Sequence, residues 1–167
     1  IDAEPDMDKF MQLQYTDEGT VQEALNNKIA KIGENMNIRR FANFSQPGCV
    51  YVGYVHGAGK IGVIVGLETE ASAAEVEVVG KDVAMQVAAA NPTYLDKAGV
   101  PADEIAKEKE ILTQQAINEG KPANIAEKMI MGRINKYYKE VCLLEQPFIK
   151  DGDITVSKYI ENCAKEL

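Results

Sequence analysis

The run from His56 to Ile61 is the part of the chain that comes nearest to a chemical motif, because it reads His-Gly-Ala-Gly-Lys-Ile. A Gly-Lys pair occurs in the loop whose backbone N–H groups cradle nucleotide phosphates. That loop needs a glycine five positions before the pair, where this chain has Tyr54, and Ser or Thr after the lysine, where it has Ile61. We therefore predict a β-hairpin turn at Gly57-Ala58-Gly59 and no nucleotide site.

His56 is the only histidine and hence the only imidazole available for general-base catalysis. Neither Ser45 nor a cysteine neighbours it in sequence together with a supporting carboxylate, as a hydrolase site would require. The many acidic residues lie among lysines in helical segments, a pattern typical of solvated surfaces. We therefore expect a protein-binding module rather than an enzyme, with His56 as a side chain at the end of a strand.

The three cysteines, Cys49, Cys142 and Cys163, are far apart in sequence and form no CxxC pair. With a single histidine, this spacing offers no zinc site, and the odd number disfavours a disulfide framework. We expect buried, reduced thiols in a cytoplasmic protein, and we predict neither a cofactor nor a metal ion.

The composition indicates a folded protein that meets other proteins. At 167 residues the chain can form one domain or two small ones, and an apolar fraction of 46% supports a packed core. A net charge of −8 repels phosphate backbones, so we expect no direct nucleic-acid partner. The chain has no run of eighteen apolar residues and starts with a polar, acidic stretch. We therefore expect neither a membrane span nor a signal peptide.

The elements that would position His56 are two strands, over 49–56 and 60–67, joined by the glycine turn. One face of the second strand carries its apolar side chains: Ile61, Val63, Val65 and Leu67. Gly62 and Gly66 lie on the opposite face, which predicts that a helix or another backbone approaches closely there.

A helix is predicted directly after this hairpin. The sequence Ser72-Ala73-Ala74-Glu75 is a capping-box signal, and Asn91-Pro92 ends the segment. The valines between them recur at helical spacing: Val76, Val79, Val83 and Val87. Such a helix would cover the apolar face of the hairpin.

Residues 103–140 predict two helices folded back on each other. Apolar side chains recur at helical spacing in both halves: Ile105, Ile111, Leu112 and Ala116, then Ile125, Met129, Ile130, Ile134, Tyr137 and Val141. The break at Gly120-Lys121-Pro122 suits the end of one helix and the start of the next, and so short a break makes the helices antiparallel. Two interpretations are open: a surface hairpin that rests on its own domain, or a projecting arm that binds a partner.

The remaining segments complete an α+β layout. They are a short helix over 6–15, a helix from the capping box Thr20–Glu23 to Gly33, an extended piece over 38–45, and a last helix capped by Thr155. The predicted fold is thus a small antiparallel sheet, the hairpin, covered by helices and carrying an inserted antiparallel helical hairpin.

Three runs of the chain resemble bacterial elongation factor Ts. They are Lys31-Ile32-Gly33-Glu34-Asn35-Met36-Asn37-Ile38-Arg39-Arg40; Tyr54-Val55-His56-Gly57 followed by Gly59-Lys60-Ile61-Gly62-Val63; and Gly120 to Met129, continuing through Gly132-Arg133 and Lys136-Tyr137-Tyr138 to Gln146-Pro147-Phe148. The runs come in the family's order and spacing, none is a generic motif, and together they cover the chain from about Asp17 to Leu167.

The resemblance implies a guanine nucleotide exchange factor for elongation factor Tu, without covalent chemistry. Members bind the GDP-bound partner, distort its nucleotide and magnesium site, and prefer the nucleotide-free form, so that GDP leaves. The family likeness implies that Ile32 and Gly33 press on a partner helix beside the guanine pocket, and that His56 touches the partner's third domain. The helical hairpin matches the family's coiled-coil or dimerisation arm, which implies a homodimer through the arm as a second possible contact.

The resemblance also implies a division of the chain. Residues 1–37 would be the helical tail of a first core subdomain, 38–98 with 142–167 the second core subdomain, and 99–141 the arm. Full members carry a Thr-Asp-Phe-Val motif whose phenylalanine wedges in near the partner's magnesium site, and Tyr15-Thr16-Asp17-Glu18 does not match it. We therefore expect a fragment of such a protein.

Two functions stay open at this point. One is a part of the exchange factor that binds the GTPase, and the other is a helical-arm module for protein interaction or self-assembly without exchange activity. Ile32 also allows two interpretations, because it could be an exposed contact at a turn or a core residue of its own helix.

Overall fold

The structure, a computed structural model, describes residues 6–17 and 19–167. Within these ranges the chain forms six α-helices and three small antiparallel sheets of two strands each, which confirms the predicted α+β class. It divides into two compact units, Ile1–Pro47 and Gly48–Leu167, which are described separately below. The finer division into 1–37, 38–98 with 142–167, and 99–141 stays a prediction.

The first unit contains two helices and a short strand pair. In order they are α1 (Met7–Gln12), β1 (Gln14–Thr16), β2 (Gly19–Thr20) and α2 (Val21–Ile32). The helix predicted over 6–15 therefore ends earlier than expected, because the chain turns extended at Leu13 and β1 pairs with β2. The piece over 38–45 was predicted to be extended, but it forms no strand in the described part of the chain. Its Phe41 ring stacks on Phe10, with ring centroids 4.2 Å apart.

Helix α2 has the predicted start and end. The Glu23 N–H donates to Thr20 Oγ1 at 3.3 Å, and the Thr20 N–H donates to the Glu23 carboxylate at 2.7 Å, which makes a reciprocal capping box. At the other end Gly33 adopts φ +80° and its N–H donates to the carbonyl of Ile29 at 2.8 Å. A left-handed residue of this kind ends a helix at little steric cost when it is glycine.

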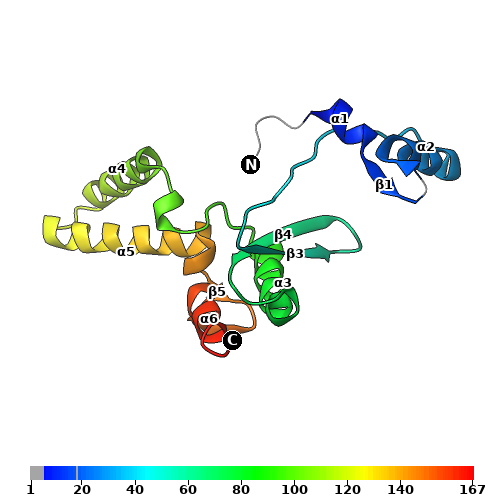
Figure 1. Cartoon of the computed structure of the whole chain (residues 1–167). Coiled ribbons are helices and arrows are strands. Elements are labelled where there is room, and N and C mark those ends of the chain that lie inside the picture. The colour runs from blue at the N-terminus through cyan, green and yellow to red at the C-terminus, as the bar shows by residue number, and fades with distance from the viewer. Residues whose placement is uncertain (1–5, 18) are drawn as a thin grey trace. The chain divides into compact units, whose positions relative to one another are not determined.

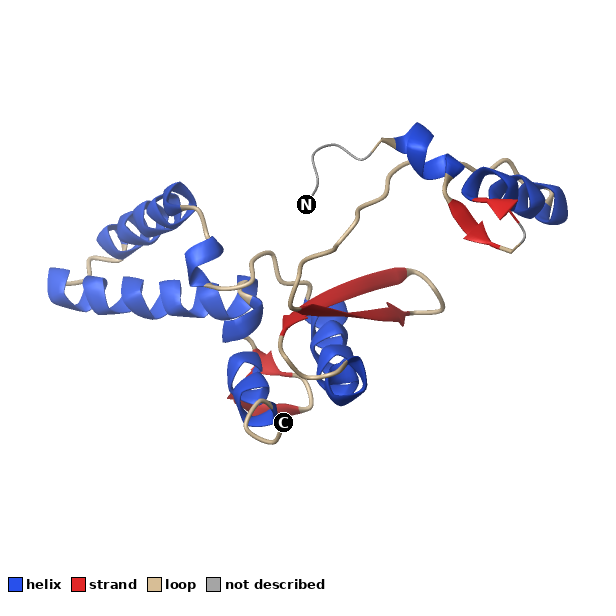
Figure 2. Ribbon diagram, viewed as in Figure 1, coloured by secondary structure: helices blue, strands red, loops and turns tan. Residues whose placement is uncertain are grey.

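The second unit contains the hairpin, its covering helix, the helical arm and the closing elements (Figures 1 and 2). In order they are β3 (Cys49–His56), β4 (Ile61–Glu68), α3 (Ala73–Ala90), the 3₁₀ helix η1 (Lys97–Gly99), α4 (Ala102–Asn118), α5 (Ala123–Val141), the 3₁₀ helix η2 (Leu143–Glu145), β5 (Pro147–Phe148), β6 (Asp151–Thr155) and α6 (Val156–Cys163).

Helix α3 covers one face of the β3–β4 hairpin, as predicted. The strands pair antiparallel with Val52 opposite Val65, and Val65 packs against the buried core around Val83. The helix lies so close to β3 that a Cβ at Gly80 would be only 2.4 Å from Cγ2 of Val52. Glycine is therefore required on the helix and not on the strand.

The close approach predicted at Gly62 and Gly66 is wrong. Among the described residues, nothing lies within 4 Å of a Cβ placed at Gly62, and at Gly66 the near neighbour is the Tyr51 ring, with Cε1 at 2.9 Å. Because α3 covers the opposite face of the hairpin, the glycines provide room for an aromatic side chain of the same sheet.

Buried polar side chains of α3 form hydrogen bonds with the closing elements of the chain, from η2 to α6. Gln86, which is 1% exposed, donates to Gln146 Oε1 at 3.0 Å and accepts from the Ile149 N–H at 2.8 Å. Asp82 accepts from Lys150 Nζ at 2.5 Å and from the Tyr159 hydroxyl at 2.8 Å. Each buried polar group thus has partners, which keeps the cost of its desolvation low.

Helices α4 and α5 form the antiparallel arm that the periodicity predicted. Gly120 adopts φ +66° at the break, and the seam buries Leu112, Ala116 and Ile134. Two residues that were predicted to lie in the seam do not, because Ile111 and Ile125 are 52% and 46% exposed. Within the second unit the helices extend away from the sheet (Figure 1). Helix α5 contacts η2 at the base of the arm. This arrangement favours the interpretation of a projecting arm over that of a surface hairpin that rests on its own domain.

Candidate functional site

The end of α2 presents an apolar side chain outward. Of the predicted helical stripe, Val21 is buried and Leu25 and Ile29 are half-buried, whereas Ile32 is 54% exposed. Ile32 is the last helical residue, and Gly33 ends the helix directly after it. The alternative that Ile32 is a core residue of its own helix therefore does not hold.

The tip of the β3–β4 hairpin presents His56. The side chain is exposed, and its backbone pairs with Ile61 as the last pair of the ladder. The turn that follows has three successive residues with positive φ: Gly57 at +62°, Ala58 at +55° and Gly59 at +90°. A non-glycine residue in the left-handed region is uncommon and costs free energy, and such positions cluster at functional sites.

Tyr54 contacts His56 on the same face of β3. Its hydroxyl lies 2.9 Å from His56 Nδ1, and the two ring centroids are 5.9 Å apart. Side chains two residues apart on a strand point the same way, which places the pair. The sequence analysis missed this contact, although the alternation Tyr54-Val55-His56 within a predicted strand was the signal for it.

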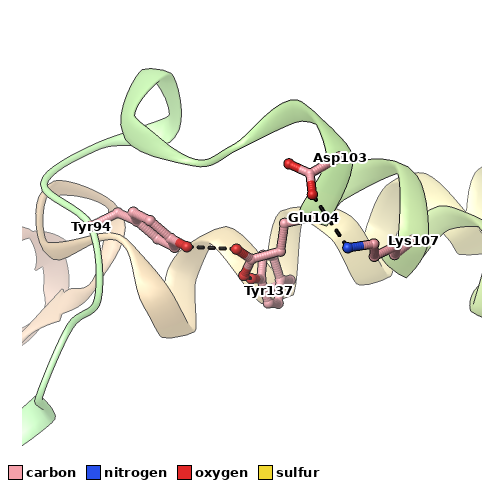
Figure 3. A network of polar contacts seen from close by, with 5 residues as sticks. All are labelled: Tyr94, Asp103, Glu104, Lys107 and Tyr137. Atoms are coloured by element: carbon pink, nitrogen blue, oxygen red, sulfur yellow. Dashed lines mark hydrogen bonds and ion pairs between the residues drawn. The ribbon is translucent and has the colours of Figure 1, made fainter.

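A second polar cluster, at the root of the arm, was also missed (Figure 3). The Glu104 carboxylate, in the first turn of α4, accepts hydrogen bonds from two phenols. The Tyr94 hydroxyl donates to Oε2 at 2.5 Å, and the Tyr137 hydroxyl donates to Oε1. Tyr94 precedes the arm and Tyr137 lies near the end of α5, so one carboxylate joins the chain entering the arm to the chain leaving it.

Hydrogen bonding fixes the protonation states in this root cluster. The two phenols, Tyr137 first, lower the pKa of Glu104, because a donated hydrogen bond favours the charged carboxylate. The same bonds raise the pKa of both Tyr137 and Tyr94, since each hydroxyl proton is shared with an anion. The cluster therefore holds an ionised carboxylate and two protonated phenols, which is a structural arrangement and not an acid/base pair poised for catalysis.

The backbone closes the root of the arm as well. Tyr94 and Cys142 form a parallel bridge, and the Leu143 N–H donates to the carbonyl of Tyr94 at 2.9 Å. Cys142 is fully buried, and burial raises the pKa of its thiol. Cys142 is thus the buried thiol that was expected, while Cys49 and Cys163 are half-buried.

The predicted contact residues lie in different units: Ile32 and Gly33 belong to the first and His56 to the second. Their assignment to a partner surface stays a prediction, supported so far by their exposure. None of the helices in the described ranges has the length and apolar character needed to cross a membrane.

Comparison with known proteins decides the family to which the chain belongs. A family model described as elongation factor TS matches residues 2–167. The chain belongs to the elongation factor Ts family. The resemblance seen in the three sequence runs is thereby confirmed, and with it the assignment to a family of translation elongation factors.

Named relatives agree with the family match. A protein of Clostridioides difficile (strain 630) named elongation factor Ts is 60% identical over 146 residues, which is 87% of this chain and 48% of the relative. One of Clostridium botulinum (strain Eklund 17B / Type B) with the same name is 51% identical over 160 residues, or 96% of this chain and 53% of the relative. The chain thus spans about half the length of the curated relatives it matches.

Proposed function

We propose that this chain binds the GTPase elongation factor Tu and forms part of the exchange factor that promotes GDP release from it. Membership of the elongation factor Ts family carries the proposal. The exposure of Ile32 and His56 at turns that follow rigid elements supports it, because side chains that serve a partner must be available in the free protein.

The proposed activity needs no covalent chemistry. An exchange factor that binds the nucleotide-free GTPase more tightly than the GDP-bound form lowers the GTPase's affinity for GDP by the same factor, since the coupling between two ligands is reciprocal. The required parts are therefore rigid contacts that fit the distorted partner better than its resting form.

Ile32 would supply the apolar contact. A capped helix fixes its position, and Gly33 turns the chain away immediately after it, so the side chain stands at the end of α2. Within the described part of the chain, nothing lies within 4 Å of a Cβ at Gly33, which leaves room for a partner backbone there. His56 would supply a polar contact from the hairpin tip.

Titration of the chain with elongation factor Tu·GDP tests the proposal. We expect Ile32→Ala and His56→Ala to leave the thermal midpoint nearly unchanged and to weaken binding, by about 1 kcal/mol or more if the side chain is a hot spot. Val78→Ala is the matched control, because Val78 is 66% exposed on α3 and is not one of the predicted contact residues. Unchanged affinity in both variants would reject these two contacts, and undetectable binding by the parent chain would reject the proposal.

Release of a fluorescent GDP analogue from the same complex measures exchange itself. If the chain accelerates release, it contains the parts needed for exchange. Binding without acceleration would mean that the chain supplies contacts to elongation factor Tu but does not by itself distort the nucleotide site.

Self-assembly through the arm is the second candidate function. The observation that favours it is the set of exposed apolar side chains on the arm: Ile111, Ile117, Ile125 and Met131. Sedimentation velocity over a range of concentrations tests it, with Ile117→Asp as the variant, since Ile117 is 63% exposed and its replacement spares the seam. Concentration-dependent dimers that Ile117→Asp abolishes would support this function, and a monomer at all concentrations would reject it.

A further inference from the structure

The side chains of Tyr54 and His56 contact each other at the tip of the β3–β4 hairpin. Tyr54 is half-buried and His56 is exposed, and the Tyr54 hydroxyl reaches Nδ1, the ring nitrogen nearer the His56 backbone. The other ring nitrogen, Nε2, lies on the far side of the imidazole from this contact. One nitrogen is thus engaged within the chain and the other is available at an exposed side chain.

The chemistry of the two rings favours one direction for this hydrogen bond. A neutral imidazole has one N–H donor and one nitrogen with a free lone pair, and the hydrogen bond at one nitrogen sets which tautomer is present. A phenol donates well, whereas its oxygen accepts less readily than the basic imidazole nitrogen. The favoured arrangement has the Tyr54 O–H donating to Nδ1, which places the imidazole proton on Nε2.

We infer that Tyr54 is a positioning residue for His56: it holds the ring in the Nε2–H tautomer and in one orientation, so that the hairpin tip offers a fixed N–H donor to an acceptor oxygen on the partner. The inference rests on the proposed function for the identity of that partner. The acceptor it requires is a backbone carbonyl or a carboxylate, because a donor on the partner would find no lone pair on Nε2.

The surrounding backbone makes this positioning effective. Tyr54 pairs with Val63 and His56 with Ile61 in the continuous β3–β4 ladder, so both Cα positions are fixed. The left-handed turn at Gly57–Gly59 follows directly. With the backbone held, the hydrogen bond from Tyr54 removes the remaining rotational freedom of the imidazole, and ordering a side chain before binding reduces the entropy lost in the complex.

Nuclear magnetic resonance of the free chain tests the tautomer without any partner. Because His56 is the only histidine, a long-range ¹H–¹⁵N spectrum at a pH where the ring is neutral shows a single imidazole. We expect an unprotonated Nδ1 and a protonated Nε2 in the parent chain, and in Tyr54→Phe a shift of the Nδ1 signal together with growth of the other tautomer. Tyr51→Phe is the control: it removes the hydroxyl of a tyrosine whose ring packs over Gly66 of the same hairpin.

Binding to elongation factor Tu·GDP tests the consequence. We expect Tyr54→Phe to weaken binding about two- to tenfold, the effect of one hydrogen bond, and to have no further effect in a His56→Ala background. Of two replacements of the histidine, His56→Gln should keep more affinity than His56→Asn, because the glutamine amide nitrogen reaches the place of Nε2 and that of asparagine reaches only the place of Nδ1.

The outcomes separate the inference from the function it rests on. His56 signals that are the same in Tyr54→Phe and in the parent chain would overturn the positioning role of Tyr54, whatever binding shows. Equal losses for His56→Gln and His56→Asn would overturn the presentation of an Nε2–H donor. If His56→Ala binds as tightly as the parent chain, the proposed contact at His56 is wrong, while the tautomer measurement still decides whether Tyr54 holds the ring.

Discussion

Helices α3 and α5 have nearly the same length, 18 and 19 residues, but they are held in very different ways. Helix α3 lies between the hairpin and the closing elements and buries residues on several sides: Val76, Gly80, Asp82, Val83, Ala84 and Gln86. In α5, among the residues whose burial is described, the buried one is Ile134. The core is thus a layered packing, and the arm is a pair of helices that share one narrow seam.

The two regions therefore differ in which substitutions destabilise them. In the layered core a change of one methyl group meets atoms on all sides, because protein interiors are close-packed. In the arm most positions face solvent, so its stability depends on a few seam residues and on the polar cluster at its root. Substitutions in the seam, in the core, on the exposed side of α5 and in the root cluster should therefore differ in size and in sign.

Ile134→Asp should have the largest effect. Ile134 is 6% exposed in the seam, and an unpaired charge buried there should destabilise the arm by roughly 3–5 kcal/mol. We expect reduced helicity in circular dichroism and fast hydrogen exchange confined to α4 and α5. Met131→Asp on the same helix is the control, since Met131 is 62% exposed. Full protection of the arm in Ile134→Asp would show that the helices are held by more than the seam.

Gly80→Ala should destabilise the core by about 1–3 kcal/mol despite the better helix propensity of alanine. The new Cβ would lie 2.4 Å from Cγ2 and 2.7 Å from Cβ of Val52, so that α3 or β3 has to move. Chemical denaturation measures the loss. A much smaller loss from Gly80→Ala in a Val52→Gly background, which removes both contacted atoms, would assign the effect to this one contact, and a neutral Gly80→Ala would refute the close packing of α3 on the sheet.

Gly132→Ala should have the opposite sign. Gly132 also lies in a helix interior, but among the described residues nothing comes within 4 Å of a Cβ placed there. Alanine should therefore stabilise the arm by about 0.5–1 kcal/mol through reduced backbone entropy in the unfolded chain. The measurement is the same denaturation curve together with exchange rates in α5. Destabilisation by Gly132→Ala would mean that this side of α5 contacts another part of the chain or a second molecule.

Glu104→Gln should have the smallest effect and should depend on pH. Because the folded-state pKa of Glu104 is lowered, its stabilisation is fully present above the ordinary value near 4.5 and is lost as the pH falls through the folded pKa. The thermal midpoint of the variant should therefore lie below that of the parent chain at pH 7, and the two should converge below about pH 4.5. Glu110→Gln on the same helix controls for the change in net charge. A pH-independent difference would assign the effect to packing.

Local signals made much of the fold predictable. The capping box Thr20–Glu23, the helix end at Gly33 and the turn at Gly57–Gly59 were each predicted from a few neighbouring residues, because their conformations are decided by local sterics and hydrogen bonds. Strands β5 and β6 were not predicted, since their two and five residues are too few to show an alternation.

Contacts between distant residues were not predictable in this way. Ile111 and Leu112 are adjacent and equally apolar, and the helical period does not decide which one enters the seam; the partner helix does. Likewise no pattern in the sequence connects Glu104 with Tyr94 and Tyr137, or Gln86 with Gln146. At the candidate site, the exposure of His56 followed from its place at a hairpin tip. The sequence left Ile32 open between an exposed contact and a core residue, and the contact of Tyr54 with His56 needed the side-chain geometry.

The bridge between Tyr94 and Cys142 has an evolutionary consequence. Because the two ends of the arm lie side by side, at the spacing of neighbouring strands, the intervening residues form an insertion that enters and leaves the fold at one point. Whole helical turns can be gained or lost at its far end without displacing the strands and helices behind the bridge. The arm can therefore change in length and in surface residues during evolution while the rest of the unit keeps its shape. A new binding surface can arise on the arm without substitutions in the core.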